Sequence, residues 1–482
     1  MGIRLASVRS LFLDNTTVKQ TVFKNTFWLG TAEATTRLLK LVLMIYVARI
    51  LGATEYGRFS FALAFVSLFY IFHDFGLPLV VTREFSVEKG TEGDFHSVLS
   101  LKVLLSIGVS IAILIGSTFV TSDTSVRATM GILATFSFTS GFLTIVYAFF
   151  QARQRMEYQS WAIILQACVV TPVGILVLLK APSSRNLGYS YLLSSLVALV
   201  FALTVLHFKV SPLKLEWRPV VWRRFMEMSW PMAMMGLSGI LYTYLDSALL
   251  GYLGFVEETG WYNAAYSIIH VVLVPAGLIG TSVYPILSKI FKDSEDRFQD
   301  TLQVQINVMI LLAVPLVTGG IALAPRIIGV LYGPEYLASV PALQILLLIV
   351  VFVFVGTPLQ YGFFAAGKQM TVVYVTTAGA VVNILLNVLL IPRFTLYGAA
   401  AATLATYALM FALQLFAVKQ ITRISILNKE MARVIVHAML STGVMYLVIS
   451  QERVYNLNLA VAILVGASTY FAAFFVLRRT AG

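Results

Sequence analysis

Three ionisable residues stand close together inside the first long apolar stretch of the sequence. Glu33, Arg37 and Lys40 follow one another at spacings of four and three residues, which places them on one face of a helix. A charge at the centre of a bilayer costs about 2.5–3.5 kcal/mol, so this face is expected to line a wet cavity. The bidentate guanidinium of Arg37, with Lys40 beside it, suits a phosphate. The alternative is a structural Glu33–Arg37 pair, with Lys40 reaching toward the membrane interface.

Acidic and histidine side chains in other apolar stretches indicate ion coupling or gating. Asp246 and His270 lie at comparable depth in successive stretches, and a carboxylate and an imidazole that face a cavity can exchange protons or bind a cation. Alternatively, Asp246 pairs with the cations of the first stretch and locks the closed bundles. Asp74 is adjacent to His73, so on a helix the two side chains point about 100° apart. Asp74 is therefore a gating candidate or the partner of a neighbouring helix.

Aromatic and amide side chains are candidates for contacts with sugars. Tyr242 and Tyr266 lie deeper than the neighbouring aromatic residues expected at the membrane interface. Asn383 and Asn387 belong to a stripe at helical spacing, which is more typical of helix packing than of ligand contact. The sequence contains no Walker A motif, no HExxH and no metal-spaced His/Cys cluster. We therefore predict no catalytic residue, no metal and no cofactor.

Membrane-spanning helices must position these residues. Of the 482 residues 59% are apolar and only 12% are charged, whereas about a quarter are charged in a typical soluble protein. Apolar stretches long enough to cross a bilayer recur throughout, without the period-2 alternation of a membrane barrel. We predict an all-α polytopic membrane protein with about fourteen spans, at 26–49, 59–81, 97–120, 128–150, 158–180, 188–208, 226–252, 261–284, 303–324, 340–364, 371–391, 397–418, 431–450 and 457–477.

The basic residues give the orientation and exclude one class of partner. If the N-terminus is cytoplasmic, 24 of the 34 lysines and arginines fall in cytoplasmic segments and eight in outer loops. This bias predicts a multi-pass protein of the cytoplasmic (cell) membrane with both termini in the cytoplasm. The net charge of +12 is spread over short loops, so nucleic acid is not an expected partner.

Two halves of the chain resemble each other. LGATEYGRF (51–59) is echoed by LGFVEETGWY (253–262), and FFQARQRM (149–156) by FFAAGKQM (363–370). Parallel repeats are a recurring transporter architecture; chance similarity of short apolar words is the alternative. The predicted organisation is a cytoplasmic tail, a six-helix bundle, a cytoplasmic linker, a second six-helix bundle and an additional helix pair, over residues 1–25, 26–208, 209–225, 226–418 and 431–477.

Several segments resemble the oligosaccharide flippase (polysaccharide biosynthesis export) family, whose superfamily also holds multidrug exporters and the lipid II flippase. They are ARILGATEYGRFSFALA, LYGPEYLASVPALQILLL, GFFAAGKQM and NILLNVLLIPRFTLYGAAAATLATY. Thr395-Leu396-Tyr397 departs from the family, where a smaller Gly-containing turn is expected. The resemblance implies a V-shaped pair of bundles that exposes a central cavity to each side in turn. It also implies a polyprenyl-(di)phosphate-linked oligosaccharide as substrate.

The expected function is therefore flipping of this lipid-linked oligosaccharide by alternating access, without enzyme activity. Membrane lipids surround the protein, and polysaccharide-assembly proteins are candidate partners. The sequence shows no ATP site. Transport is therefore expected to draw on an H⁺ or Na⁺ gradient, on the membrane potential or on consumption of the substrate. The alternatives are a drug/cation antiporter of the same superfamily, and a polyprenyl-dependent membrane glycosyltransferase or polymerase. The cationic face argues against the antiporter, and the short outer loops argue against the enzymes.

Overall fold

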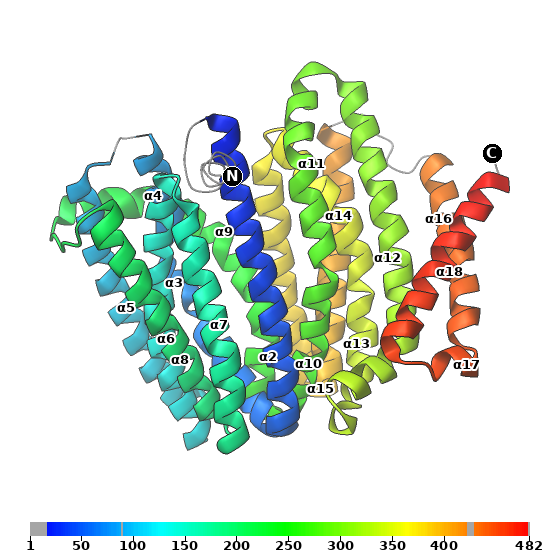
Figure 1. Ribbon diagram of the computed structural model, residues 1–482, viewed down its shortest axis with the longest axis horizontal. Coiled ribbons are helices and arrows are strands. Elements are labelled where there is room, and N and C mark those ends of the chain that lie inside the picture. Colours follow the sequence, from blue (N-terminus) through cyan, green and yellow to red (C-terminus); the bar gives the residue numbers. More distant parts are fainter. Residues whose placement is uncertain (1–16, 88–89, 422–428, 481–482) are drawn as a thin grey trace, which may run out of the picture. The chain divides into compact units, whose positions relative to one another are not determined.

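The computed structural model describes residues 17–87, 90–421 and 429–480 (Figure 1). Within these ranges the regular structure consists of helices and includes no strand, so the predicted all-α class is confirmed. Residues 1–16 of the predicted cytoplasmic tail lie outside the described residues.

Most of these helices are long enough for a membrane. The described residues contain 11 helices that are long and apolar enough to cross a bilayer, or up to 12 if a bent pair counts as one span. Two of them, Phe23–Ser86 and Gln369–Lys419, each cover two of the predicted spans. Gly52 has non-helical backbone angles inside the first of these two helices, and Thr395 has them inside the second. The polytopic membrane fold is confirmed, and the number fourteen remains a prediction.

By their internal contacts the residues divide into two compact units, Met1–Glu257 and Glu258–Gly482. The first unit contains α2 (Val18–Leu68), α3 (Tyr70–Asp74), α4 (Leu77–Ser86), α5 (Glu92–Val120), α6 (Thr124–Ala152), α7 (Met156–Lys180), α8 (Ser184–Val205), η1 (Leu206–Val210) and α9 (Pro219–Tyr252). This division groups α9 with the first unit. The predicted bundle boundary before α9 remains a prediction.

Two sets of helix contacts build the first unit. Helix α6 packs against α4, α5 and α8, while α2 packs against α7 and α9. Buried aromatic rings fill the space between α4, α5 and α6, where Phe95 and Phe149 stack with ring centroids 3.8 Å apart. The edge of Phe85 meets Phe149 at 5.5 Å. Such ring packing adds to the stability that apolar burial alone provides.

The predicted span 59–81 is broken inside the first unit. Phe75 and Gly76 take left-handed backbone conformations, with φ of 44° and 72°, and separate α3 from α4. A Cβ on Gly76 would lie 2.6 Å from the carbonyl oxygen of Ser229 on α9. Only glycine therefore fits, because both the backbone conformation and the close approach exclude a side chain.

The second unit is built around α12. Its elements are α10 (Val256–Val272), α11 (Val274–Asp293), α12 (Glu295–Leu331), η2 (Pro334–Tyr336), α13 (Ser339–Leu347), α14 (Ile349–Ala365), α15 (Gln369–Ile421), α16 (Lys429–Ile449), α17 (Glu452–Tyr455) and α18 (Leu459–Thr480). Helices α14 and α16 pack against α12, and α16 packs against α18. The Tyr470 hydroxyl donates to the carbonyl of Leu311 at 3.0 Å. The C-terminal helices α16 and α18 thus dock on α12.

Candidate functional site

The three residues predicted to bind phosphate lie on one accessible face of α2. Arg37 Nε donates to Glu33 Oε1 at 2.6 Å, and the two side chains are 50% and 60% exposed. Lys40, one turn further on, is exposed too. Within the described ranges Lys40 has no ion-pair partner, and the two terminal nitrogens of the Arg37 guanidinium have no hydrogen-bond acceptor. The face therefore carries one net positive charge, with free N–H donors.

The opposite side of α2 is fixed to α7 and to the turn before it. Lys24 is fully buried, pairs with Glu157 at 3.0 Å and donates to the carbonyl of Gln154 at 3.1 Å. Further along, Thr171 donates to the carbonyl of Leu39 at 3.4 Å. These contacts set the rotation of α2 and leave its ionisable face uncovered within the unit. In the sequence Lys24 and Glu157 look like ordinary charges at the ends of spans, so neither was predicted.

Asp74 is already paired within the first unit. Its Oδ1 accepts hydrogen bonds from Lys102 Nζ at 2.5 Å and from the Thr144 hydroxyl at 2.7 Å. Helix α5 begins at Glu92, so Lys102 lies inside a helix, as in the predicted span 97–120, although it was one of the 24 basic residues counted as cytoplasmic. Of the two interpretations of Asp74, this geometry favours the one in which it satisfies a neighbouring helix.

Asp246 and Tyr242 both belong to α9. Asp246 is only 1% exposed, whereas Tyr242 is partly exposed. Helix α9 packs against α2, and the buried carboxylate is closed off from solvent in this conformation. Its role in ion coupling or gating remains a prediction.

Tyr266 and His270 lie in the second unit on successive turns of α10. The Tyr266 ring stacks on Tyr262 with centroids 5.6 Å apart, and it meets His270 edge to face at 4.6 Å. His270 is exposed, while Tyr266 is half-buried. Both side chains are thus partly accessible, as a sugar contact and an ion-coupling group would require.

Asn383 and Asn387 are buried in the second unit. Asn387 Nδ2 donates to Asn383 Oδ1 at 3.0 Å, and Asn383 Nδ2 donates to the Thr406 hydroxyl at 3.4 Å. The two asparagines are 1% and 0% exposed. A ligand has no access to them in this conformation, and their contacts are those of helix packing.

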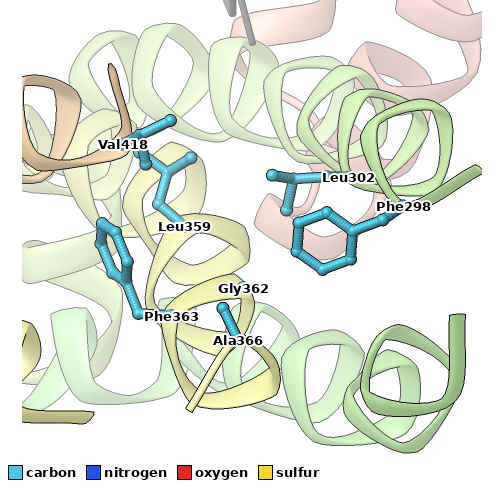
Figure 2. A pocket seen from close by; sticks show the side chains of 7 residues that line it. All are labelled: Phe298, Leu302, Leu359, Gly362, Phe363, Ala366 and Val418. Atoms are coloured by element: carbon cyan, nitrogen blue, oxygen red, sulfur yellow. The ribbon is translucent and has the colours of Figure 1, made fainter. Parts of the chain in front are cut away.

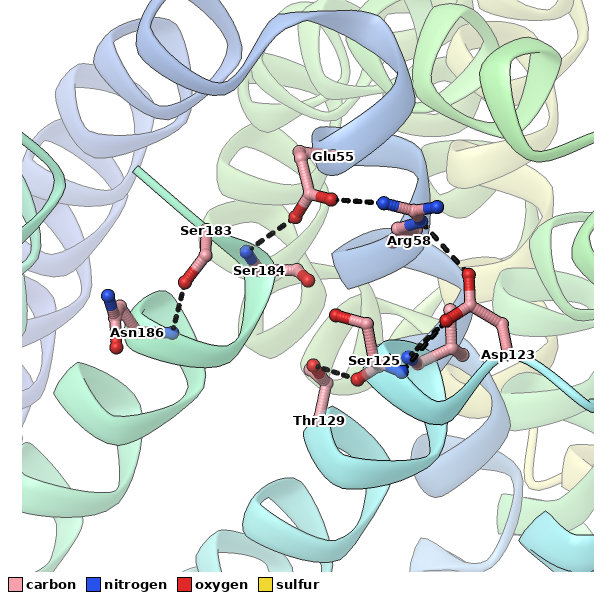
Figure 3. A network of polar contacts seen from close by, with 9 residues as sticks. Glu55, Arg58, Asp123, Ser125, Thr129, Ser183, Ser184 and Asn186 are labelled. Atoms are coloured by element: carbon pink, nitrogen blue, oxygen red, sulfur yellow. Dashed lines mark hydrogen bonds and ion pairs between the residues drawn. The ribbon is translucent and has the colours of Figure 1, made fainter. Parts of the chain in front are cut away.

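A polar network that was not predicted joins three helices of the first unit (Figure 3). Arg58 pairs with Glu55 and with Asp123, the latter at 3.1 Å. Glu55 also accepts from the backbone N–H of Ser184 at the start of α8. Asp123 caps α6 by accepting from the N–H of Ser125 at 2.8 Å. The network fixes the bend of α2 against α6 and α8; the capping residues before each helix were the sequence signal for it.

The described cavities contain none of the predicted site residues. A cavity of about 10 Å³ in the second unit is lined by apolar side chains (Figure 2) and has room for one water molecule at most. Its lining residues are Phe298, Leu302, Leu359, Gly362, Phe363, Ala366 and Val418. A cavity of about 280 Å³ lies beside Asp123 in the first unit. Within the described ranges no three His, Cys, Asp or Glu residues are placed to hold a metal ion.

Two family sequence models match the chain, over most of the first unit and part of the second. The sequence model of the family described as "Polysaccharide biosynthesis protein" matches residues 22–291. A second model, MatE, matches residues 231–389. The first match covers more than half of the chain.

Two curated relatives are from Haloferax volcanii. The "Probable low-salt glycan biosynthesis flippase Agl15" is 23% identical over 411 residues, which cover 83% of this chain and 84% of that protein. The "Probable flippase AglR" is 25% identical over 405 residues, which cover 78% of this chain and 79% of that protein.

Two solved structures share the fold. The lipid II flippase MurJ in an inward closed conformation aligns with a TM-score of 0.78 at 16% identity, covering 94% of this chain and 99% of MurJ. An inward-facing multidrug resistance transporter of the MATE family aligns with a TM-score of 0.66 at 13% identity, covering 81% of this chain and 96% of that chain. At such identities the similarity establishes the fold alone.

Proposed function

Because the chain belongs to the polysaccharide biosynthesis protein family, we propose that it is a flippase that moves a polyprenyl-(di)phosphate-linked oligosaccharide across the cell membrane. The observation that carries this proposal is the face of α2. Arg37 and Lys40 present free N–H donors there, and one positive charge of the face is not neutralised. Two relatives named as flippases support the same function.

A phosphate is the ligand that fits this charge. Holding an unneutralised cation within a membrane span is costly, and a lipid phosphate supplies the missing negative charge. Two parallel N–H donors of Arg37 can bind two phosphate oxygens, while Lys40 adds a point charge. Glu33 accepts from the guanidinium through its Nε, and neither terminal nitrogen donates to this carboxylate.

The remaining predicted residues have supporting roles in this proposal. Tyr242 and Tyr266 stack on sugar rings. Asn383 and Asn387 act as sugar contacts only in a conformation that uncovers them. Asp246 and His270 couple the cycle to H⁺ or Na⁺ or gate it. No bond is made or broken, so the protein acts as a transporter and not as an enzyme.

The antiporter alternative rests on the MatE match at residues 231–389. A site for cationic drugs needs an excess of carboxylates, whereas Glu33 is outnumbered by Arg37 and Lys40 on the α2 face. The charge balance thus favours an anionic substrate. The relatives named as flippases favour transport over the glycosyltransferase or polymerase alternative. We place both termini in the cytoplasm and expect polysaccharide-assembly proteins nearby.

The test is a flipping assay in proteoliposomes that contain the purified protein. A polyprenyl-diphosphate oligosaccharide is incorporated in both leaflets, and a membrane-impermeant glycosidase digests the outer pool. Continued digestion of the inner pool, absent from protein-free vesicles, is the expected result. Efflux of a cationic dye without movement of the glycolipid would instead establish the antiporter.

A further inference from the structure

The break between α3 and α4 holds a charge pair, with a buried lysine and a partly exposed aspartate, that phosphate transport does not use. Asp74 is the last residue of α3, and the left-handed residues Phe75 and Gly76 follow it. Such a break leaves the last carbonyls of a helix without their usual N–H partners. Inside a bilayer no bulk water replaces those partners, so another group must satisfy them.

The ammonium of Lys102 on α5 occupies this position. Its Nζ lies 2.6 Å from the carbonyl oxygen of His73, 2.5 Å from Asp74 Oδ1 and 3.4 Å from the Thr144 hydroxyl. Lys102 is 0% exposed. The Thr144 hydroxyl has two acceptors for its proton, Asp74 Oδ1 and the carbonyl of Gly141, each at 2.7 Å; with either acceptor its lone pairs are left for the ammonium. A carbonyl, a carboxylate and a hydroxyl oxygen thus surround one positive charge.

These are the oxygen types that hold a small hard cation in a membrane transporter, where carbonyls freed at broken helices bind the ion. We propose that the α3–α4 break is a monovalent-cation site whose occupant is the Lys102 ammonium. The ammonium carries the same charge as a free ion, but it is attached to α5 and cannot leave. An ordinary ion pair would need only the carboxylate of Asp74; the freed carbonyl of His73 is what makes this a cation site.

Two consequences follow. First, the site does not exchange ions in the natural protein, so a coupling ion has to bind elsewhere. Second, removal of the ammonium alone creates a vacant site for Na⁺ or Li⁺. Neither consequence depends on the proposed function, because both are properties of folding stability and can be measured without substrate.

The experiment compares thermal unfolding midpoints in detergent for the natural protein and Lys102→Met. Choline chloride is replaced by LiCl, NaCl or KCl at constant ionic strength. The natural protein should unfold at the same temperature in all four salts. Lys102→Met should unfold earlier in choline, and Na⁺ or Li⁺ should raise its midpoint saturably by about 2 °C or more. Lys102→Met/Asp74→Asn, which has lost the carboxylate, should show no such rise.

Lys102→Gln provides a second variant, because its amide can still donate to the carbonyl of His73 if the methionine is poorly tolerated. Folding of either variant only in Na⁺ or Li⁺ supports the proposal. Equal midpoints of a folded Lys102→Met protein in all four salts overturn it. Failure of both single variants to fold in any salt also overturns it, because no free cation then replaces the ammonium. A saturable Na⁺ effect on the natural protein that Asp74→Asn abolishes overturns it as well.

Discussion

Gly52 and Gly254 both have a positive φ at the same place in two similar segments, LGATEYGRF and LGFVEETGWY. Their φ angles are 70° and 87°. Each glycine follows a leucine and lies three residues before a glutamate. A glycine with positive φ at both matching positions supports the internal repeat, although Gly52 combines it with an extended ψ of 173°.

This conformation gives the first prediction. Gly254→Ala should lower the stability of the protein by about 1–2 kcal/mol, because a Cβ strains a left-handed backbone. No atom lies within 4 Å of the position of that Cβ, so the loss reports the backbone alone. Thermal unfolding in detergent measures it. Gly108→Ala, inside α5 and equally uncrowded, is the matched control and should be neutral or slightly stabilising. Equal midpoints for the two variants would show that the bend tolerates a side chain.

The network of Figure 3 gives the second prediction. Asp123→Ala should cost about 1–2 kcal/mol, because α6 loses its N-cap and Arg58 loses one of its two carboxylate partners. Asp123→Asn keeps the capping oxygen and should lose less than half as much. The two unfolding midpoints separate the cap from the ion pair. If the asparagine variant is as unstable as the alanine variant, the ion pair with Arg58 stabilises this region and the N-cap of α6 does not.

How much the sequence could predict is clear from the charged residues. Composition and apolar length were sufficient for the all-α membrane fold, and the spacing of Glu33, Arg37 and Lys40 was sufficient to place them on one face. Lys102 lies inside the predicted span 97–120 but was counted among the cytoplasmic charges, because a single lysine near the start of an apolar stretch is indistinguishable from an interfacial one. Its partner Asp74 is 28 residues away. Such pairing depends on how α3 and α5 pack, which a local pattern does not contain.

The second pair of similar segments, FFQARQRM and FFAAGKQM, also shows a limit of prediction from sequence. A sequence alignment of FFQARQRM with FFAAGKQM pairs Phe149 with Phe363. The backbone hydrogen bonds instead align Phe150 with Phe363, because Arg155 N–H donates to Phe150 O and Lys368 N–H donates to Phe363 O, each at 2.8 Å. The repeated element is therefore the helix-ending turn and not the pair of phenylalanines. Turn geometry is set by the residue with positive φ, Gln154 in one copy and Gly367 in the other, and glutamine gives no sequence signal for it.

Topology gives the third prediction. Reporter fusions at either terminus should be active only in the cytoplasm, and Lys214→Cys in the 209–225 linker should react only with reagents that reach the cytoplasmic side. Cys168 is exposed and must first be replaced by serine. Labelling of Lys214→Cys from outside intact cells would reverse the orientation that the charge bias predicts.

Access of water to the α2 face gives the fourth prediction. Arg37→Cys and Lys40→Cys, in the Cys168→Ser background, should react with a charged thiol reagent. Leu43→Cys, one turn beyond Lys40 but only 1% exposed, is the buried control and should react at least about tenfold more slowly. Similar rates at the three positions would mean that α2 rotates or that the face with Arg37 and Lys40 is not accessible to water.

The central claim is that Arg37 receives the substrate phosphate, and the flipping rate of Arg37→Ala in proteoliposomes tests it most directly. A charged hydrogen bond is worth about 1.5–3 kcal/mol, so the variant should lose at least about tenfold in rate at matched protein content. Arg37→Lys should keep part of the activity, because lysine keeps the positive charge but lacks the two parallel N–H donors of the guanidinium. Arg223→Ala is the matched control, because Arg223 pairs with Glu227 at the same four-residue spacing and itself lies outside the predicted spans; it should transport at the natural rate. Natural-rate flipping by folded Arg37→Ala would contradict the account and leave Arg37 as the packing partner of Glu33.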